Sequence, residues 1–353
     1  MSFMMDEIEQ QPAALERTLR EELPRIEAFR RRIAHRPISM VCLVARGTSD
    51  NAAVFGRYLI ETLVQVPTSL AAASVTTLYG ARPRWKDALV IALSQSGEST
   101  DTNLYVQTAR ESGALTVGIT NEQDSSLTRL VDEVFLVHAG REKSVAATKT
   151  YTGQLLMLYL LAYALSAPVP PKSLERLPAL ADRALGVKKN VAALSERYRF
   201  MQRAVVVGRG LNYANAFEFA LKMMETCYVL AERFSGADFL HGPIALVERA
   251  FPVFVFAPPG PTRDTTLDTL RRLRTLEAET ILIGPARDGE AAALATRTIA
   301  VPATGAVPRG CPGDLLTPVP YIIPAQMFCA FLAGQKGLDP DRPRTLTKVT
   351  QTI

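Results

Sequence analysis

The chain has 353 residues, of which 48% are hydrophobic and 21% charged, and its formal net charge is +5. This balance is typical of a folded globular protein and excludes a disordered chain. The length suits two α/β domains. Because no apolar run is long enough to span a bilayer and no secretory signal is visible at the N-terminus, a cytoplasmic location without a membrane partner is expected.

Residues 1–37 predict a helical arm, because their arginines alternate with apolar residues at helical spacing. No aromatic residues are interleaved as in nucleic-acid sites, so a solvated helix face is favoured over a nucleic-acid partner. Apolar runs and helix-length segments then alternate across residues 38–165, which predicts a first doubly wound α/β domain with a parallel sheet. Its expected strands are residues 41–45, 88–93, 115–120 and 133–138, and its expected helices include residues 51–64 and 102–111.

Residues 166–197 begin with three closely spaced prolines and predict an inter-domain linker. A second α/β domain is expected over residues 198–338. Both domains open with an apolar strand that ends in Arg-Gly, at Arg46 and at Arg209, and an internal duplication explains this most simply. Residues 339–353 are expected to form a tail that covers the active site. The strands of the second domain are predicted at residues 204–208, 252–257, 280–284 and 298–301.

The cysteines and glycines give no sign of a metal or a cofactor. The cysteines are scattered, without a CxxC pair or a histidine cluster, so they predict reduced, mostly buried thiols. Gly208-Arg209-Gly210 resembles part of a dinucleotide fingerprint, with Glu232 at about the spacing of the ribose-binding acid. However, the third glycine is replaced, which argues against NAD. The cysteines in question are Cys42, Cys227, Cys311 and Cys329.

The strongest local signal is the hydroxyl-rich segment that follows the strand at 88–93. It runs through Ser94, Gln95, Ser96, Gly97, Glu98 and Ser99 and then opens a helix. Backbone N–H groups, hydroxyls and the positive end of a helix suit an anion such as phosphate. A simple N-cap is the alternative, but one cap needs only one such residue. The missing Gly-Lys-Ser/Thr ending excludes a nucleotide P-loop.

Three further segments carry candidate residues. Thr48 and Ser49 follow the first strand in the same way, where a helix cap and a functional role remain equally open. Lys222 and Glu225 are three residues apart on one helix face, which is either a surface ion pair or, among apolar neighbours, a general base with its partner. His241 lies in a Gly-Pro turn, where a side chain is usually presented to solvent, although most such histidines are bystanders.

Together these pieces resemble a known family along nearly the whole chain. The order of motifs is similar to two tandem sugar isomerase (SIS) domains, which are flavodoxin-like α/β sandwiches, and looks like the isomerase half of the glutamine:fructose-6-phosphate amidotransferases. Several motifs in the same order make chance resemblance improbable. The motifs are GTS (47–49), LSQSGESTDT (93–102), VAATKTYTGQL (145–155), FALKMMET (219–226), LHGPIALVE (240–248) and DRPRTLTKVTQTI (341–353).

The resemblance implies a role for each candidate residue. Glu225 would move a proton between C1 and C2 of the sugar, with Lys222 beside it. His241 would open the ring and is supplied in that family by the neighbouring subunit, which implies a homodimer. Lys348 would reach the sugar carbonyl. The substrate-binding set would hold a sugar phosphate and comprises Ser94, Gln95, Ser96 and Ser99 for the phosphate, and Ser49 and Val145, with Thr48 beside them, for the hydroxyls.

Two departures from the family affect the expected function. The glutaminase domain with its N-terminal cysteine, roughly two hundred residues, is not in this sequence, and Met224 stands where the family has a lysine. The leading expectation is therefore a glucosamine-6-phosphate deaminase that needs neither metal nor cofactor. The alternatives are a phosphosugar isomerase, a deglycase acting on another amine-linked sugar phosphate, and, in a different class, a non-catalytic sugar-phosphate sensor.

Overall fold

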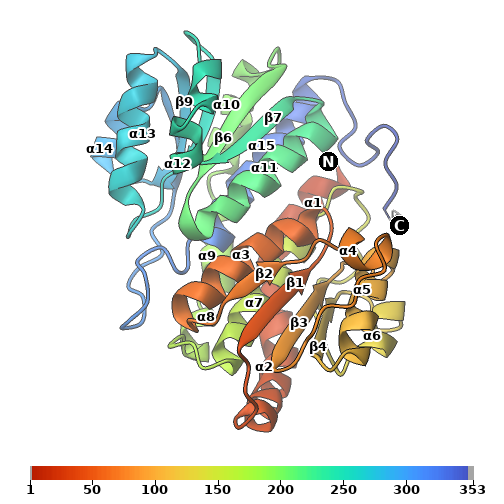
Figure 1. Ribbon diagram of the computed structural model, residues 1–353. Coiled ribbons are helices and arrows are strands. Elements are labelled where there is room, and N and C mark those ends of the chain that lie inside the picture. The colour runs from red at the N-terminus through yellow and green to blue at the C-terminus, as the bar shows by residue number, and fades with distance from the viewer. Residues whose placement is uncertain (1, 349–353) are drawn as a thin grey trace. The chain divides into compact units, whose positions relative to one another are not determined.

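The computed structural model describes residues 2–348, which divide into two compact units (Figure 1). Unit A contains residues 13–142 and 149–175 and the described residues from 345 onward. Unit B contains the described residues up to 12, residues 143–148 and residues 176–344. The last five residues of the expected tail, and of the C-terminal motif, lie outside the described part of the chain.

Unit A is built on a five-stranded parallel sheet, here called sheet A, with the order β2-β1-β3-β4-β5. The residues of β3 and β4 are buried throughout, as expected for strands that are covered on both faces. The strands are β1 (Met40–Val44), β2 (Thr68–Leu70), β3 (Ala88–Leu93), β4 (Leu115–Thr120) and β5 (Glu133–Leu136).

Helices cover both faces of sheet A (Figure 1). On one face Phe29 packs edge-on against Phe135, with ring centroids 5.5 Å apart, and Phe55 against Tyr159 at 4.9 Å. Tyr105 belongs to the apolar cluster on the other face. The first face carries α2 (Gln11–Ile33), α3 (Thr48–Leu63) and α7 (Lys149–Ala164), and the second α4 (Ser74–Thr77), α5 (Thr100–Glu111) and α6 (Ser126–Leu130).

Unit B contains a second five-stranded parallel sheet, sheet B, with the order β10-β9-β8-β6-β7. Numbered within its own unit, this is the same strand order as that of sheet A. The doubly wound parallel fold and its duplication, both expected from the sequence, are therefore confirmed. The strands are β6 (Arg203–Gly208), β7 (Leu230–Ser235), β8 (Pro252–Phe256), β9 (Glu279–Pro285) and β10 (Arg297–Val301).

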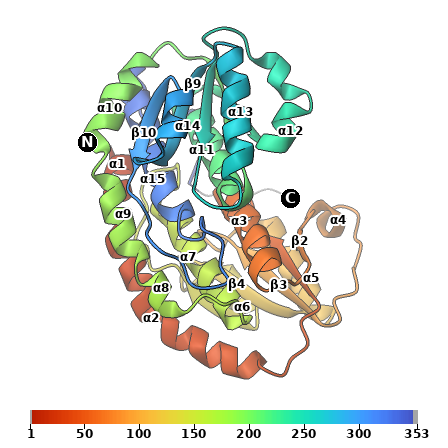
Figure 2. The same ribbon diagram turned by 90° about the vertical axis from the view of Figure 1, so that its left-hand side faces the viewer.

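Helices also cover both faces of sheet B, with α10 and α13 on opposite sides in Figure 2. Rings of Phe219, Phe254 and Phe328 meet edge-on in the core of one face. That face carries α10 (Lys188–Arg197), α11 (Tyr213–Cys227) and α15 (Pro318–Gln335), with α1 (Phe3–Glu9) and α9 (Leu177–Leu185) packed on α15. The other face carries α12 (Gly236–Leu240), α13 (Arg263–Thr275) and α14 (Gly289–Leu294), and the short helices η1 (Gly210–Asn212) and η2 (Pro243–Leu246) lie in connecting segments.

Each sheet has an edge strand that the sequence did not predict. The strand β2 has three residues, too few for a periodic signal. The strand β7 carries Glu232 and Arg233, both exposed, so its pattern resembles a loop. Glu232 therefore lies on a sheet edge, beside Arg233. Residues 166–197, expected as a linker, contain α8 (Pro171–Leu174), α9 and α10.

The cysteines and the hydropathy of the helices were also predicted from the sequence. The four cysteines are free thiols, and Cys42, Cys227 and Cys329 are buried, which confirms the interpretation made from their spacing. Among the described residues, no helix is both long and apolar enough to cross a membrane.

Candidate active site

The strand order of sheet A defines a crevice of the kind in which open α/β folds bind their ligands. The chain leaves β1 toward β2 on one side and later returns to β3 on the other, so the order reverses between β1 and β3. Ligands in such sheets bind outside the carboxyl ends of the strands at this reversal. The segments that leave these two strand ends are 45–47 and 94–99. The hydroxyl-rich residues singled out from the sequence lie in these segments or directly after them.

The segment Ser94–Ser99, here called the serine loop, is shaped by its own hydrogen bonds. Ser94 Oγ accepts from the N–H of Gly97 at 3.1 Å, and Ser96 Oγ accepts from the N–H of Glu98 at 3.3 Å. Ser94 is buried, whereas Gln95, Ser96 and Ser99 are partly exposed. The loop is therefore held in shape by its own residues, with part of its polar surface facing solvent.

The start of α5 is not capped by the residue at its N-cap position. Ser99 occupies that position, but its hydroxyl makes no capping bond and instead bonds the side chains of Asp101, at 3.0 Å, and Thr102, at 3.1 Å. The simple N-cap, which was the alternative considered for this loop, is therefore not what the hydroxyl provides. Asp101 Oδ1 instead accepts the N–H of Thr102 at 2.8 Å, so the first turn of α5 is partly satisfied by a carboxylate of its own. The remaining N–H groups of a helix N-terminus suit an anion.

Gly97 is required by the shape of the serine loop. Its φ of +67° lies in the left-handed region, and a Cβ atom at this position would lie 2.1 Å from Ser125 Oγ. Both the conformation and the close approach exclude larger residues. The loop is also held by Asn103, which donates its side-chain amide to the Gly97 carbonyl at 3.0 Å.

The end of β1 brings a cation and a second hydroxyl to the same crevice. Arg46 forms an ion pair of 2.5 Å with Asp101, which is only 2% exposed. Ser49, 6% exposed, accepts a hydrogen bond of 2.8 Å from the side-chain amide of Gln154. The N-cap of α3 is Gly47, so Thr48 and Ser49 are in the first turn of the helix and neither is its cap.

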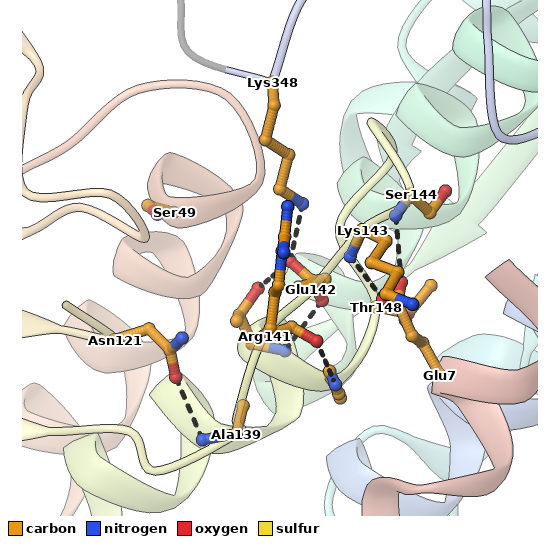
Figure 3. Close-up of polar contacts among 12 residues, drawn as sticks. Glu7, Ser49, Asn121, Ala139, Arg141, Glu142, Lys143, Ser144, Thr148 and Lys348 are labelled. Carbon is orange, nitrogen blue, oxygen red and sulfur yellow. Dashed lines mark hydrogen bonds and ion pairs between the residues drawn. The ribbon is translucent and has the colours of Figure 1, made fainter. Parts of the chain in front are cut away.

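Lys348, from the C-terminal segment, lies against the connection between β5 and α7 (Figure 3). Its Nζ is 2.9 Å from Oε2 of Glu142, a carboxylate whose side chain is completely buried. Glu142 also accepts from the N–H and the hydroxyl of Thr150, at 3.2 and 2.8 Å, at the start of α7. This carboxylate therefore joins a helix start to the side chain of a distant lysine.

The segment 143–148, which contains Val145, belongs to unit B. Glu7 on α1, 3% exposed, accepts the N–H groups of Lys143 and Ser144, as Figure 3 shows. The carbonyl of Thr148 accepts from the amide of Gln326 at 3.3 Å. Val145 itself is half-buried.

The centre of unit B's candidate chemistry is a charged trio on α11. Nζ of Lys222 lies 2.5 Å from Glu225 Oε2 and 3.4 Å from Glu218 Oε1. The side chains of Lys222 and Glu218 are 1% and 0% exposed, whereas that of Glu225 is 22% exposed. Of the three, Glu225 alone can therefore meet a ligand while still touching the buried cation.

The two carboxylates determine the charge of Lys222. Burial alone would lower the pKa of this lysine, but the negative charges of Glu218 and Glu225 and their hydrogen bonds raise its pKa well above the usual value. The lysine is thus a permanent cation and a hydrogen-bond donor at neutral pH. The surface ion pair considered from the sequence is excluded for Lys222, because this residue is buried.

His241 stands apart from the trio. It caps the C-terminus of α12 through its backbone, its N–H bonding the carbonyl of Asp238 at 3.1 Å, and its side chain is exposed. Among the described residues, no hydrogen bond or ion pair links His241 to Lys222 or Glu225. The imidazole is presented to solvent, as the Gly-Pro turn predicted.

The structure thus groups the predicted residues in two sets. Unit A holds Thr48, Ser49, the serine loop and Lys348, and unit B holds Val145, Lys222, Glu225 and His241. The sequence reasoning missed the charged partners of these residues. The Arg-Gly pair that contains Arg46 was interpreted only as a sign of duplication. No local sequence pattern predicted the acidic partners. The missed residues are Arg46, Asp101, Glu142 and Glu218.

Known proteins are similar to this chain over both of its sheets. The family model described as the SIS domain matches residues 38–164 and 200–328. A glutamine–fructose-6-phosphate aminotransferase (isomerizing) of Methanothermobacter thermautotrophicus is 36% identical over 98% of this chain. The match covers 57% of that relative, so the chain spans little more than half its length.

Solved structures share the whole fold. The C-terminal domain of glucosamine-fructose-6-phosphate aminotransferase from Francisella tularensis gives a TM-score of 0.86 at 27% identity, over 97% of this chain and 98% of that one. A provisionally assigned phosphosugar isomerase from Silicibacter pomeroyi DSS-3 gives 0.82 at 30% identity, over 97% and 100%. Glucosamine-6-phosphate deaminase from Thermotoga maritima gives 0.77 at 21% identity, over 99% and 100%, and at that identity shares the fold alone.

Proposed function

The chain belongs to the SIS domain family, and on that premise we propose that it is an enzyme that deaminates glucosamine 6-phosphate. The reaction consumes one water molecule and releases fructose 6-phosphate and ammonia. The observation that carries the proposal is the trio on α11, in which a partly exposed Glu225 contacts the buried cation of Lys222. A carboxylate in this setting suits proton transfer on a sugar carbon.

The serine loop is the proposed phosphate site. The partly exposed Gln95 and Ser96 and the first backbone N–H groups of α5 are the proposed donors for the phosphate oxygens. Arg46 adds a positive charge beside them and is held in place by Asp101. Binding the phosphate here would fix one end of the substrate and leave its C1 and C2 ends for the catalytic groups.

The proposed chemistry begins when the sugar ring opens, a step assigned to His241. Glu225 then removes the proton from C2 of the open-chain amino aldehyde and returns it to C1, which converts the aldehyde into an alcohol and the amine into a ketimine. Water adds to the ketimine carbon, and ammonia leaves. Lys348 is the proposed donor to the oxygen that becomes negatively charged in the enol-like intermediate, and the buried Lys222 is proposed to orient Glu225 and stabilise its charge.

The residues proposed for the site are ones that can move a proton between neighbouring sugar carbons. What these residues support by themselves is the exchange of ammonia between the sugar and water. The names of the aminotransferase relatives, which are similar over nearly the whole chain, support an amino-sugar phosphate as substrate.

The test is release of ammonium from glucosamine 6-phosphate by the purified chain, with fructose 6-phosphate measured as the second product. The two products should appear in equal amounts, and the Glu225→Gln variant should lose at least a hundredfold in rate. A Glu232→Gln variant, altered on the exposed edge strand β7, serves as the matched control. Equal ammonium from wild type and Glu225→Gln would reject the proposal.

The main competing activity is isomerisation of another sugar phosphate without loss of nitrogen. The similarity to the phosphosugar isomerase from Silicibacter pomeroyi DSS-3 favours testing it. A panel of aldose and ketose phosphates, with and without an amine at C2, separates the two activities by whether nitrogen is released. Binding without any turnover on this panel would instead favour a sugar-phosphate sensor.

A further inference from the structure

Because both sheets have the same strand order, sheet B has its own reversal, between β6 and β8. The corresponding reversal in sheet A carries the serine loop. In sheet B the segments leaving the strand ends are 209–212 and 257–262. Ligands bind at such reversals in open α/β folds, so sheet B has a second position where a ligand is expected.

The second reversal cannot bind phosphate as the serine loop does. In place of the serines, the segment after β8 reads Pro258, Pro259, Gly260 and Pro261. Proline has no backbone N–H, so this segment offers carbonyl oxygens and few donors. A site built here would accept hydrogen bonds from its ligand.

Two buried oxygen atoms at this reversal lack hydrogen-bond partners among the described residues, Oδ1 of Asp314 and Oγ1 of Thr262. Asp314 is 2% exposed. Both residues lie beside Gly210, where an added Cβ atom would lie 3.0 Å from Thr262 Cγ2 and 3.7 Å from Asp314 Oδ2. A buried carboxylate oxygen without a partner, such as Oδ1 of Asp314, is costly, and its presence at a ligand-binding position requires an explanation.

The neighbouring groups do not neutralise Asp314. Arg263 is engaged by Asp288, at 2.9 Å, and by Glu290, at 3.0 Å. Arg209 precedes the shared glycine, yet it makes no ion pair with any described residue. Asp288 and Asp314 both raise the pKa of the buried Tyr321, after the larger effect of burial. Burial also raises the pKa of Asp314, to about 6, so this carboxylate is mostly charged at neutral pH.

The local hydrogen-bond donors are already used. The side-chain amide of Asn212 donates to Thr317 Oγ1 at 2.7 Å, and that hydroxyl donates to the backbone carbonyl of Asp314 at 2.7 Å. Neither reaches the carboxylate. Apart from the hydrogen bond from its own backbone N–H, the Asp314 carboxylate therefore has no donor and no ion-pair partner among the described residues.

We propose that Asp314 and Thr262 form a second ligand site, which binds a protonated primary amine, either the ammonium ion or the ammonium group of an amino sugar. An ammonium group has several N–H donors, enough for both orphan oxygens, and its charge offsets that of the carboxylate. A neutral hydroxyl would satisfy the hydrogen bonds but leave the charge uncompensated. The site goes beyond the proposed deamination, because no catalytic residue takes part in it.

The experiment follows the melting temperature of the full chain at pH 8 while ammonium chloride replaces sodium chloride at constant ionic strength. A second pair of titrations compares glucosamine with glucose. Ligands that bind only the folded state raise the melting temperature, and a rise on the order of 2 °C is expected for ammonium or for glucosamine. If only glucosamine raises the melting temperature, the ligand is the ammonium group of an amino sugar. If ammonium chloride raises it as well, the site also binds the free ammonium ion.

Variants distinguish this site from other sources of stabilisation. Asp314→Asn should lose the amine-dependent rise, whereas Asp264→Asn, which changes a carboxylate that is 96% exposed on α13, should keep it. Arg209→Gln should also keep it. The Glu225→Gln variant should keep the rise while losing deamination, so failure of the enzyme proposal would not remove this one. No amine-specific rise in the wild type, or an equal rise in Asp314→Asn, would overturn the inference.

Discussion

Lys348 forms an ion pair with Glu142, Nζ to Oε2 at 2.9 Å, across 206 residues of sequence. The carboxylate is completely buried and also bonds the start of α7 through Thr150. The lysine that the family resemblance connects with the sugar carbonyl is therefore oriented by a residue that no motif predicted.

The first prediction concerns this pair. Lys348→Met should lower the turnover of glucosamine 6-phosphate by about a hundredfold, because one donor to the developing oxyanion is lost. Substrate affinity should change little, because the serine loop is untouched. Glu142→Gln keeps a side chain that can bond Thr150 but lacks the charge that orients Lys348, and a smaller loss in kcat is expected. Steady-state kinetics measure both, and Lys189→Met, an exposed lysine on α10, is the control.

The serine loop gives the second prediction. Gly97→Ala should weaken the binding of fructose 6-phosphate by at least tenfold, because its Cβ atom would lie 2.1 Å from Ser125 Oγ. Gly113→Ala is a matched control, since Gly113 also has a positive φ, of +95°, but no atom lies within 4 Å of its Cβ position. Both variants bear the conformational cost of roughly 1 kcal/mol. Titration calorimetry would contradict the assignment if the two bound equally well.

The third prediction uses the pH dependence of the trio on α11. Glu218 helps to hold the pKa of Lys222 high, against the opposite effect of burial. When Glu218→Gln removes one negative charge, the cation is less stabilised and the pKa of Lys222 falls. Any loss of rate at high pH that arises from deprotonation of Lys222 should therefore begin at lower pH than in the wild type. A profile that only drops in height, without moving, would indicate a purely structural role for Glu218.

The fourth prediction concerns the stability cost of Asp314. Its pKa in the folded state, about 6, is above the ordinary value of 3.8 because of burial. Protonation therefore favours the folded state, and stability contributed by this group falls as pH rises from about 4 to 6. Asp314→Asn should raise the free energy of unfolding by about 1–3 kcal/mol at pH 8 in amine-free buffer, and by less at pH 5. Urea unfolding at the two pH values measures the difference.

The fifth prediction tests the expected homodimer. If His241 acts on the site of the neighbouring subunit, two inactive variants, His241→Asn and Glu225→Gln, should regain activity when they are mixed and allowed to exchange subunits. Only mixed dimers contain one intact site, so recovery should approach about a quarter of the wild-type rate. If mass measurements show mixed dimers but the mixture stays inactive, both residues belong to the site of a single subunit.

Much of the fold could be read from the sequence because its central strands are continuous apolar runs. The strands at 88–93 and 115–120 were predicted with the bounds that the structure gives. The edge strands β2 and β7 were missed, since an edge strand is covered on fewer sides and its sequence carries less hydrophobic pattern. Helix starts were placed too late, because Thr48 and Thr100 resemble cap residues but lie inside α3 and α5.

The candidate site was predicted as far as its residues lie in local motifs. The residues of the serine loop are consecutive, and Lys222 and Glu225 are three residues apart, so local spacing was enough to find each group. The partners of these groups come from elsewhere in the fold. Glu142 meets Lys348, and Asp101 meets Arg46, only because separate segments of the chain fold back on each other. No sequence window contains such a pair, and only the structure could supply it.

The serine loop is already folded by hydrogen bonds among its own residues, and this has a consequence for how fast a ligand binds. No ordering of the backbone has to precede the encounter, so the ordering entropy that mobile phosphate loops lose on binding is largely absent. Association should then be limited by diffusion and by the charge of the ligand, with Arg46 drawing in anions. Differences in affinity between sugar phosphates would then come from differences in their dissociation rates.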